Sequence, residues 1–371
     1  MNRTGPQRVR PRRLVASQVV KNTPRQMGGG RPRAALVARA RESIAKGSKS
    51  FATASLLFDR GTRERSHLLY AWCRRCDDIA DGQDHGFREG GGGLKLDNAS
   101  AQDRVEAIRI LTHRALDGQP TADIAFDALG QVAAESGLTR EMCDDVIDGF
   151  ALDAQGWQPR STGDLMRYCY HVAGAVGVMM ARVMGVPADA SETLDKACDL
   201  GLAFQLNNIA RDIAEDDAAG RCYLPAEWLA GFDIPPGEHM KPQHRRALVK
   251  MAKRLVDMAQ VHDAHARIGA GHLAFRQRWA VLSAANIYGA IGEEVVQQAE
   301  LAWDSRIHTS ALEKAGHVLS ASRETISGSY VPQVHPDWDR GKLLVMARMA
   351  GPAAGVPDTP IRDEGVRPAG R

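Results

Sequence analysis

Three features of this 371-residue sequence predict an all-α fold. Apolar residues recur with a period near 3.6 through most of residues 38–350, and no strand-like alternation persists for more than a few residues. Between residues 200 and 225, polar side chains are spaced three, four and four residues apart, which places them in one narrow arc of a helix. They are Gln205, Asn208, Asp212 and Asp216, beside an apolar stripe of Leu202, Leu206, Ile209 and Ile213.

This polar stripe has two interpretations. A polar stripe bordered by an apolar one is typical of the wall of a deep pocket that is wet at its mouth and apolar below. The alternative is an ordinary amphipathic helix with a solvated polar face.

A second stretch, from Tyr70 to Asp81, favours the pocket. It places Tyr70, Arg74, Asp77 and Asp81 on one helical face. Asp77 and Asp81 are one turn apart, and like charges at that spacing destabilise an isolated helix. Two chain-distant helices that both carry such a pair imply a shared counter-charge. Carboxylates without His or Cys partners favour Mg²⁺, with Mn²⁺ as the other candidate, and Mg²⁺ usually completes its shell with water and substrate phosphates.

The two aspartate motifs resemble those of the squalene/phytoene synthase family, whose members join prenyl diphosphates head to head. The resemblance extends over nearly all of residues 47–325 and is carried by five blocks in order: GSKSFATASLLF, YAWCRRCDDIAD, YCYHVAGAVGVMMA, NIARDIAEDDAAGRCYLP and AWDSRIHTS. These blocks are most similar to the bacterial phytoene-forming branch. The resemblance implies a single-domain isoprenoid-synthase helical bundle around a central cavity.

Composition divides the chain into three parts. Residues 1–37 are rich in Arg, Pro and Gly and are predicted to be a disordered basic extension, residues 38–350 the helical domain, and residues 351–371 a flexible tail. Residues 1–43 carry a net charge of +10, so with +3 overall the remainder carries −7. The basic segment lacks interleaved aromatic residues, which argues against nucleic acid as a partner. It could attract anionic lipid, although an inert extension is the default.

The sequence also bears on location. It contains no uninterrupted apolar run of about 18 residues and no apolar signal-peptide core. Its six cysteines are scattered, and the CxxC of Cys73 and Cys76 has no second pair to complete a zinc site. Free thiols in a reducing cytosol are therefore expected. The expected location is cytoplasmic, with peripheral association at the inner face of the membrane.

The first expected helices lead into the first aspartate motif. One helix spans residues 38–46 and is interrupted at residues 47–51, either by a capped helix break or by a turn that contacts a diphosphate. The next is expected to begin at Thr62 as N-cap and to end at Asp81, with Gly82 as the stop.

Later helices are expected to form the cavity wall. Asp148 and Asp153 are expected to be solvated or to lie behind the site. Gly174 and Gly177 fall inside a helix, where each glycine costs about 1 kcal/mol relative to alanine. Either helices pack closely there or a long substrate passes the backbone, and the second interpretation is preferred. The depth of the cavity beside Val172, Ala175 and Gly177 is then expected to select substrate length.

Residue roles follow from the chemistry and from the resemblance. The predicted metal ligands are Asp77, Asp81, Asn208, Asp212 and Asp216. Guanidinium forks match phosphate oxygens, which makes Arg74, Arg211, Arg221 and Arg306 candidate diphosphate partners, with Lys49 beside them. Ser48, Ser50, Tyr70, Val172 and Gln205 are the remaining predicted substrate contacts. The predicted catalytic residues are Tyr168 and Tyr288 together with the four aspartates. The segment at residues 220–225 is expected to cover the site.

The implied reaction is a 1′-1 condensation of two geranylgeranyl diphosphates through prephytoene diphosphate to phytoene, with release of diphosphate. This is the first step of carotenoid biosynthesis, and handover to downstream carotenoid enzymes is expected. No nicotinamide is expected, because no strand-borne GxGxxG is present. Three alternatives remain. The first is a squalene or dehydrosqualene synthase, which would use farnesyl diphosphate. The second is an enzyme of head-to-tail elongation or cyclisation, which would need a different second motif. The third is a non-catalytic scaffold that would act through its basic tail.

Overall fold

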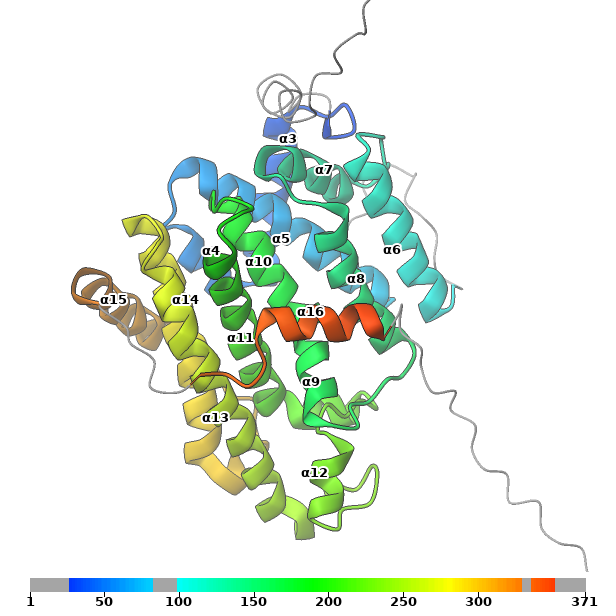
Figure 1. Cartoon of the computed structure of the whole chain (residues 1–371), viewed down its shortest axis with the longest axis vertical. Helices are drawn as coiled ribbons and strands as arrows, with labels where there is room; N and C mark the ends of the chain where they lie inside the picture. Colours follow the sequence, from blue (N-terminus) through cyan, green and yellow to red (C-terminus); the bar gives the residue numbers. More distant parts are fainter. Residues whose placement is uncertain (1–26, 83–98, 329–334, 351–371) are drawn as a thin grey trace, which may run out of the picture.

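The computed structural model describes residues 27–82, 99–328 and 335–350, without the side chains of Lys49 and Ser50 (Figure 1). The predicted tail at residues 351–371 and the first 26 residues of the predicted extension lie outside these ranges.

Helices make up most of the described chain, and no strand occurs in the described residues, which confirms the predicted all-α class. The first half contains α3 (Arg33–Gly47), α4 (Lys49–Ser55), α5 (Arg60–Ala80), α6 (Ala101–Leu116), α7 (Ile124–Ser136) and α8 (Arg140–Ala154). The middle contains α9 (Thr162–Cys169), the π-helical turn η1 (Tyr170–Gly174), α10 (Ala175–Val183), α11 (Ser191–Ala218) and α12 (Ala226–Gly231). The last part contains η2 (Pro242–His244), α13 (Arg245–Ala270), α14 (Phe275–Gln298), η3 (Ala299–Leu301), α15 (Ala311–Ser327) and α16 (Arg340–Met349).

Local capping fixes the helix that carries the first aspartate motif. The N-cap of α5 is Asp59, whose side chain accepts a hydrogen bond from the Thr62 amide at 3.0 Å. The predicted cap at Thr62 was therefore three residues late, because Thr62 acts as the donor. The helix ends at the C-cap Asp81, and Gly82 follows with φ +67°, a conformation that favours glycine, as predicted.

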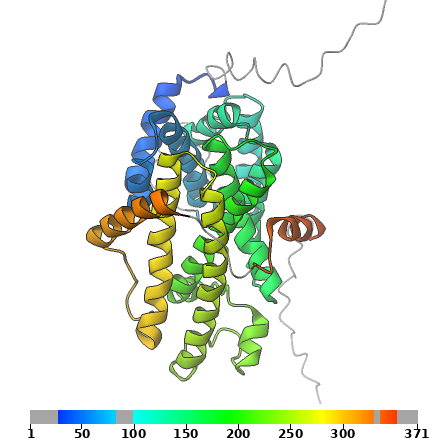
Figure 2. The same ribbon diagram turned by 60° about the vertical axis from the view of Figure 1, so that its left-hand side comes forward.

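The long helix α11 runs through the middle of the bundle and carries the second aspartate motif (Figures 1 and 2). It packs most extensively against α13 and also contacts α10, η1 and α14. On the other side of the molecule, α5 lies between α3 and α7, while α16 crosses over α9, η1 and α11. One continuous apolar core extends from Leu36 to Ala347, so the described helices form the predicted single-domain bundle.

The folded part begins earlier than the predicted boundary at residue 37. Helix α3 starts at Arg33 and buries Leu36 and Val37 in the main core. Arg33 bonds Glu64 of α5 at 2.5 Å and Glu135 of α7 at 2.6 Å, and Arg31 pairs with the buried Asp127 at 2.9 Å. The boundary was misplaced because the basic, proline-containing composition concealed two buried apolar residues.

We expect a chain that starts at Ala38 to be less stable than one that starts at Met27 by roughly 3 kcal/mol or more. The shorter chain loses two buried aliphatic side chains, each contributing about 1.5–3 kcal/mol, and leaves Asp127 without Arg31. Urea unfolding of both chains measures the difference. Equal midpoints and slopes would show that residues 27–37 do not contribute to the fold.

Candidate functional site

A cavity of about 460 Å³ lies inside the bundle, enclosed by side chains of α4, α5, α8, η1, α10, α11, α13 and α14. Most of its lining is apolar. Polar side chains that reach it from the two aspartate motifs and from α14 are Tyr70, Asp77, Gln205, Asn208 and Tyr288. Asp77 and Asn208 thus join the apolar cavity to the charged cluster described next.

Arg221 lies between the two aspartate motifs. Its Nη1 is 3.9 Å from Asp81 at the end of α5, and its Nε is 3.8 Å from Asp216 of α11. The predicted juxtaposition of the two motifs is therefore present in the fold, with a guanidinium between them. The arginine comes from the 220–225 segment that was expected to cover the site.

The cluster holds more negative charge than Arg221 neutralises. Burial raises the pKa of Asp216 to about 7, and Asp212, Asp153 and Glu215 add to this against the lowering effect of Arg221. Burial likewise raises the pKa of Asp77 to about 6, with further repulsion from Asp81 and Asp78. Part of the Asp77 side chain remains exposed, although protein atoms surround most of its carboxylate. The ionised forms of Asp77 and Asp216 are therefore disfavoured, as expected for carboxylates that bind a cation.

Among the four aspartates Asp77, Asp81, Asp212 and Asp216, Asp212 is the one that forms ion pairs with two arginines. Arg211 bonds its carboxylate through both Nε (2.7 Å) and Nη2 (2.5 Å), and Nη2 of the half-exposed Arg306 is 3.2 Å away. Both arginines were predicted to face a diphosphate. In this structure they pair with Asp212, so a phosphate contact by either remains a prediction.

The donor set fits a hard divalent cation. Oδ1 of Asn208 is buried without a hydrogen-bond partner and lies one turn before Asp212 on the same helix face. Within the part of the chain that is described, no three His, Cys, Asp or Glu side chains gather closely enough to hold an ion by themselves. Two carboxylate groups on facing helices suit Mg²⁺ that completes its shell with water and substrate phosphate. The five predicted ligands therefore remain a proposal that their chemistry supports.

Tyr168, which the family resemblance predicted to be catalytic and to lie on the cavity wall, does not line the cavity. It is buried behind the charged cluster, where its ring stacks on Tyr223 with centroids 4.7 Å apart. The hydroxyls of both tyrosines donate to Asp153, at 3.1 Å from Tyr168 and 2.8 Å from Tyr223. Burial raises the pKa of Tyr168 well above its usual value, so this phenol stays protonated.

Asp153 lies behind the site, which was one of its two expected positions, but its tyrosine partners were not foreseen. It was expected to be solvated or to lie behind the site, because it shares no close helical face with Asp148. The structure shows that it is surrounded by protein, with its pKa raised to about 6 mainly by burial. Asp148 instead pairs with Arg109 at 2.8 Å, outside the cluster. The sequence held no periodic signal for Asp153, since its partners come from α9 and the 220–225 segment.

The residues predicted near the 47–51 turn have mixed positions. Ser48 lines the cavity and caps α4 by accepting from the Phe51 amide at 3.2 Å. Tyr70 stacks on Phe51 with centroids 5.6 Å apart, and a Cβ on Gly47 would lie 2.3 Å from the Tyr70 hydroxyl, so a side chain at residue 47 would displace Tyr70. Arg74 is not part of the cavity lining and forms an ion pair with Asp78 at 2.6 Å. Ser50 and Lys49 fall among the side chains that are not described.

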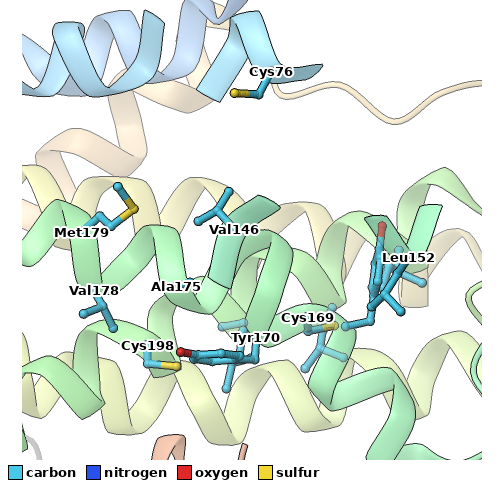
Figure 3. Close-up of a cluster of buried hydrophobic side chains, with 14 of the residues drawn as sticks. Cys76, Val146, Leu152, Cys169, Tyr170, Ala175, Val178, Met179 and Cys198 are labelled. Carbon is cyan, nitrogen blue, oxygen red and sulfur yellow. The ribbon is translucent and has the colours of Figure 1, made fainter. Parts of the chain in front are cut away.

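Gly174 and Gly177 are explained by helix packing rather than by passage of substrate. A Cβ on Gly177 would lie 2.2 Å from the Ala197 carbonyl oxygen of α11, and one on Gly174 would lie 2.9 Å from the Cys198 sulfur. The preferred interpretation was therefore wrong for these glycines, although Gly177 does border the cavity. Val172 lines the cavity as predicted, but Ala175 does not. Figure 3 shows Ala175 among buried core side chains that include Tyr170 and Cys198.

The expected free thiols are confirmed. The described cysteines are free, and burial raises the pKa of the Cys73 thiol to about 12 and that of Cys76 well above its usual value. Thiols so hard to ionise are poor metal ligands. His171 is within hydrogen-bonding distance of the Asp145 carbonyl through Nδ1 at 2.8 Å, in keeping with a structural role.

Sequence comparison gives matches over most of the chain. The family model described as squalene/phytoene synthase matches residues 44–313. A phytoene synthase of Pseudescherichia vulneris is 44% identical over 291 residues, which covers 78% of this chain and 92% of that protein. A 15-cis-phytoene synthase of Pantoea ananas is 42% identical over 301 residues, which covers 81% of this chain and 95% of that protein.

Solved structures show the same fold. A dehydrosqualene synthase in complex with a ligand superposes with a TM-score of 0.69 at 26% identity, covering 80% of this chain and 98% of that one. A squalene synthase from Alicyclobacillus acidocaldarius gives a TM-score of 0.60 at 22% identity, covering 74% and 98% of the two chains. The second likeness supports the fold alone.

Proposed function

The chain belongs to the squalene/phytoene synthase family, and we propose that it is a prenyltransferase that condenses two geranylgeranyl diphosphates head to head. The product is phytoene, formed through prephytoene diphosphate with release of diphosphate, as the first step of carotenoid biosynthesis. The relatives that are 42–44% identical over most of the chain and are named phytoene synthases support this branch of the family.

One structural observation supports the chemistry above the others. The two carboxylate pairs meet around Arg221 at the end of a cavity that is otherwise mostly apolar. A prenyl diphosphate has the same division, with a multiply charged head and a hydrocarbon tail. A non-catalytic scaffold would have no need for clustered carboxylates, two of which, Asp77 and Asp216, have raised pKa values.

Ionisation of the substrate requires the departing diphosphate to be neutralised. Bound Mg²⁺ would supply that positive charge, held by Asp77, Asp81, Asn208, Asp212 and Asp216. Arg211 and Arg306 balance Asp212 in the absence of substrate and are near enough to turn towards phosphate oxygens. Arg221 adds a third guanidinium between the two motifs.

The cavity protects the carbocation that ionisation creates. Its apolar lining excludes water, which would otherwise capture the cation. The stacked rings of Phe204 and Tyr288, with centroids 4.1 Å apart, both line the cavity and can stabilise positive charge through their faces. Tyr168 acts indirectly, by holding Asp153 with Tyr223 behind the charged cluster. The released diphosphate takes the final proton.

The location and partners of the enzyme follow from its substrate and product. None of the described helices has an apolar stretch of bilayer-spanning length. We propose a cytoplasmic enzyme that associates peripherally with the inner face of the membrane, where its hydrocarbon product would pass to downstream carotenoid enzymes. No nicotinamide is proposed, because the reaction to phytoene needs no reductant.

Separate incubations with radiolabelled geranylgeranyl and farnesyl diphosphate, with Mg²⁺ and without NADPH, test the proposal. We expect a C40 hydrocarbon from geranylgeranyl diphosphate at a higher kcat/KM than any C30 hydrocarbon from farnesyl diphosphate. A preference for farnesyl diphosphate would assign the chain to the squalene or dehydrosqualene reaction instead. Absence of any condensed product from folded protein would favour a scaffold.

A further inference from the structure

Helix α15 carries its large apolar side chains on the outside. Leu312, Leu319 and Ile326 are 84%, 58% and 78% exposed and are spaced seven residues apart, so they form one stripe along the helix. Figure 2 shows α15 at the edge of the bundle. The helix lies almost wholly beyond residue 313, where the match to the family model ends. The three side chains therefore form an exposed apolar surface.

Polar contacts hold the inner side of the helix. Glu324 accepts hydrogen bonds from Arg267 at 2.6 Å and from Asn286 at 2.9 Å. Trp279 of α14 donates to the Val318 carbonyl at 2.8 Å. The inner side also has an apolar contact, because the buried Ala321 packs with Ala270 and Leu282. The largest apolar side chains of α15 nevertheless face outward, as in a helix whose apolar face has a further partner.

The positive charge on the outer face indicates which kind of partner it binds. Arg323 is exposed and, by helical periodicity, lies within the stripe, with Ala315, Gly316, Ser320 and Ser327 around it. The carboxylate of Glu313, at the edge, accepts from the Ser310 amide in a capping box. A second copy of this face would bring no carboxylate to Arg323 and would desolvate its charge. Anionic headgroups would neutralise it while acyl chains receive the leucines and isoleucine.

A further exposed apolar side chain lies on α14, the helix that α15 packs against. Phe275, 53% exposed, lies against Trp279 with ring centroids 6.4 Å apart. Its exposed neighbour Arg276 donates to the carbonyls of Leu57 and Phe58, so its bonds do not cancel its charge. Helix α14 therefore supports the outer face through Trp279 and lines the cavity through Ala280, Val281 and Ala284.

We infer that the outer face of α15 and the adjoining Phe275 form the surface by which this protein docks on an anionic lipid bilayer. The helix lies flat, with its stripe about 5–10 Å into the boundary between headgroups and acyl chains. The inference rests on the proposed peripheral association and names the surface responsible for it. The condensation reaction does not depend on this surface. The cavity in which the hydrocarbon forms then lies one helix away from the membrane.

Flotation of the full chain with vesicles tests the surface. The vesicles are phosphatidylcholine alone or with phosphatidylglycerol, and the double variant Leu319→Gln/Ile326→Gln is compared with Ile110→Gln, which changes a 51% exposed isoleucine on α6. We expect the double variant to lower partition into anionic vesicles about tenfold or more, and the Ile110 variant to leave it unchanged. Condensation in detergent should be unaffected in both, so failure of docking and failure of the proposed reaction are separable.

Other basic segments of the chain could also bind anionic vesicles, so a second experiment measures the insertion of α15 itself into the bilayer. Leu319→Trp and Ile110→Trp are each mixed with anionic vesicles whose acyl chains are brominated. Extra quenching relative to the unchanged protein is expected for Trp at 319 and not at 110. Equal quenching at the two positions would overturn the inference. So would a wild-type dimer that the double variant converts to monomer while its vesicle binding persists, because the face would then bind a second copy.

Discussion

Asp77→Asn is expected to lower kcat/KM for geranylgeranyl diphosphate by about 10³-fold or more without unfolding the protein. Asp77 is the aspartate of the first motif that reaches the cavity, and its charge would help to hold the cation that neutralises the leaving group. Its ionised form is disfavoured by burial and by the neighbouring carboxylates. Asparagine removes that repulsion, so the melting temperature should stay the same or rise.

A second variant and a control separate catalysis from stability. Asp212→Asn should lose activity to a similar extent but should also lower the melting temperature, because it weakens the bidentate pair with Arg211. The control Asp257→Asn changes an exposed carboxylate paired with Lys253 and should alter neither property. Full activity in folded Asp77→Asn or Asp212→Asn protein would remove the two-motif mechanism.

Val176→Phe is expected to lower the use of geranylgeranyl diphosphate about tenfold more than the use of farnesyl diphosphate. Val176 lines the cavity from α10, and the added ring takes space that the extra isoprene unit of the longer substrate requires. The metal ligands and diphosphate partners stay untouched, so condensation itself should survive. The measured quantity is the ratio of kcat/KM for the two substrates, which cancels a uniform loss of active enzyme.

The choice of position matters for this test. Ala175 lies in the core rather than on the wall, and a side chain at Gly177 would collide with the Ala197 carbonyl. Phenylalanine at either position would disturb packing at a cost of about 1–3 kcal/mol or more. Val345→Phe, on the exposed side of α16, is the control for added bulk. A folded Val176→Phe enzyme with an unchanged ratio would show that this wall does not measure substrate length.

Helical periodicity predicted much of the fold and of the site. The spacing of Asp77 and Asp81, and of Asp212 and Asp216, is a property of single helices and is readable in one sequence. The need for a shared counter-charge was also inferable, and Mg²⁺ in that role stays a prediction. That Arg221 lies between the two motifs became visible only in the fold. The cavity lining by Val172, Gln205 and Tyr288 agrees with expectations carried by the family resemblance.

What the sequence missed depends on contacts between distant segments. Tyr168 contacts Asp153 and Tyr223 only because α8, α9 and the 220–225 segment converge. Helical periodicity cannot predict contacts between separate segments. The same limit applies to Gly177, where a carbonyl of α11 rather than a substrate excludes a side chain. At the beginning of α3, composition misled: Arg31 and Arg33 resemble a solvated basic tail, yet they pair with buried or half-buried acids of other helices.

Equilibrium binding of a non-ionisable geranylgeranyl thiolodiphosphate tests the central claim most directly, because it reports the charged site without turnover. With Mg²⁺ present the unchanged protein should bind the analogue tightly. Chelation of the metal, or Asp77→Asn with metal present, should weaken binding by about tenfold or more, since each removes charge neutralisation at the diphosphate. Equal affinity with and without Mg²⁺ would contradict a site in which two carboxylate pairs hold the substrate through a cation.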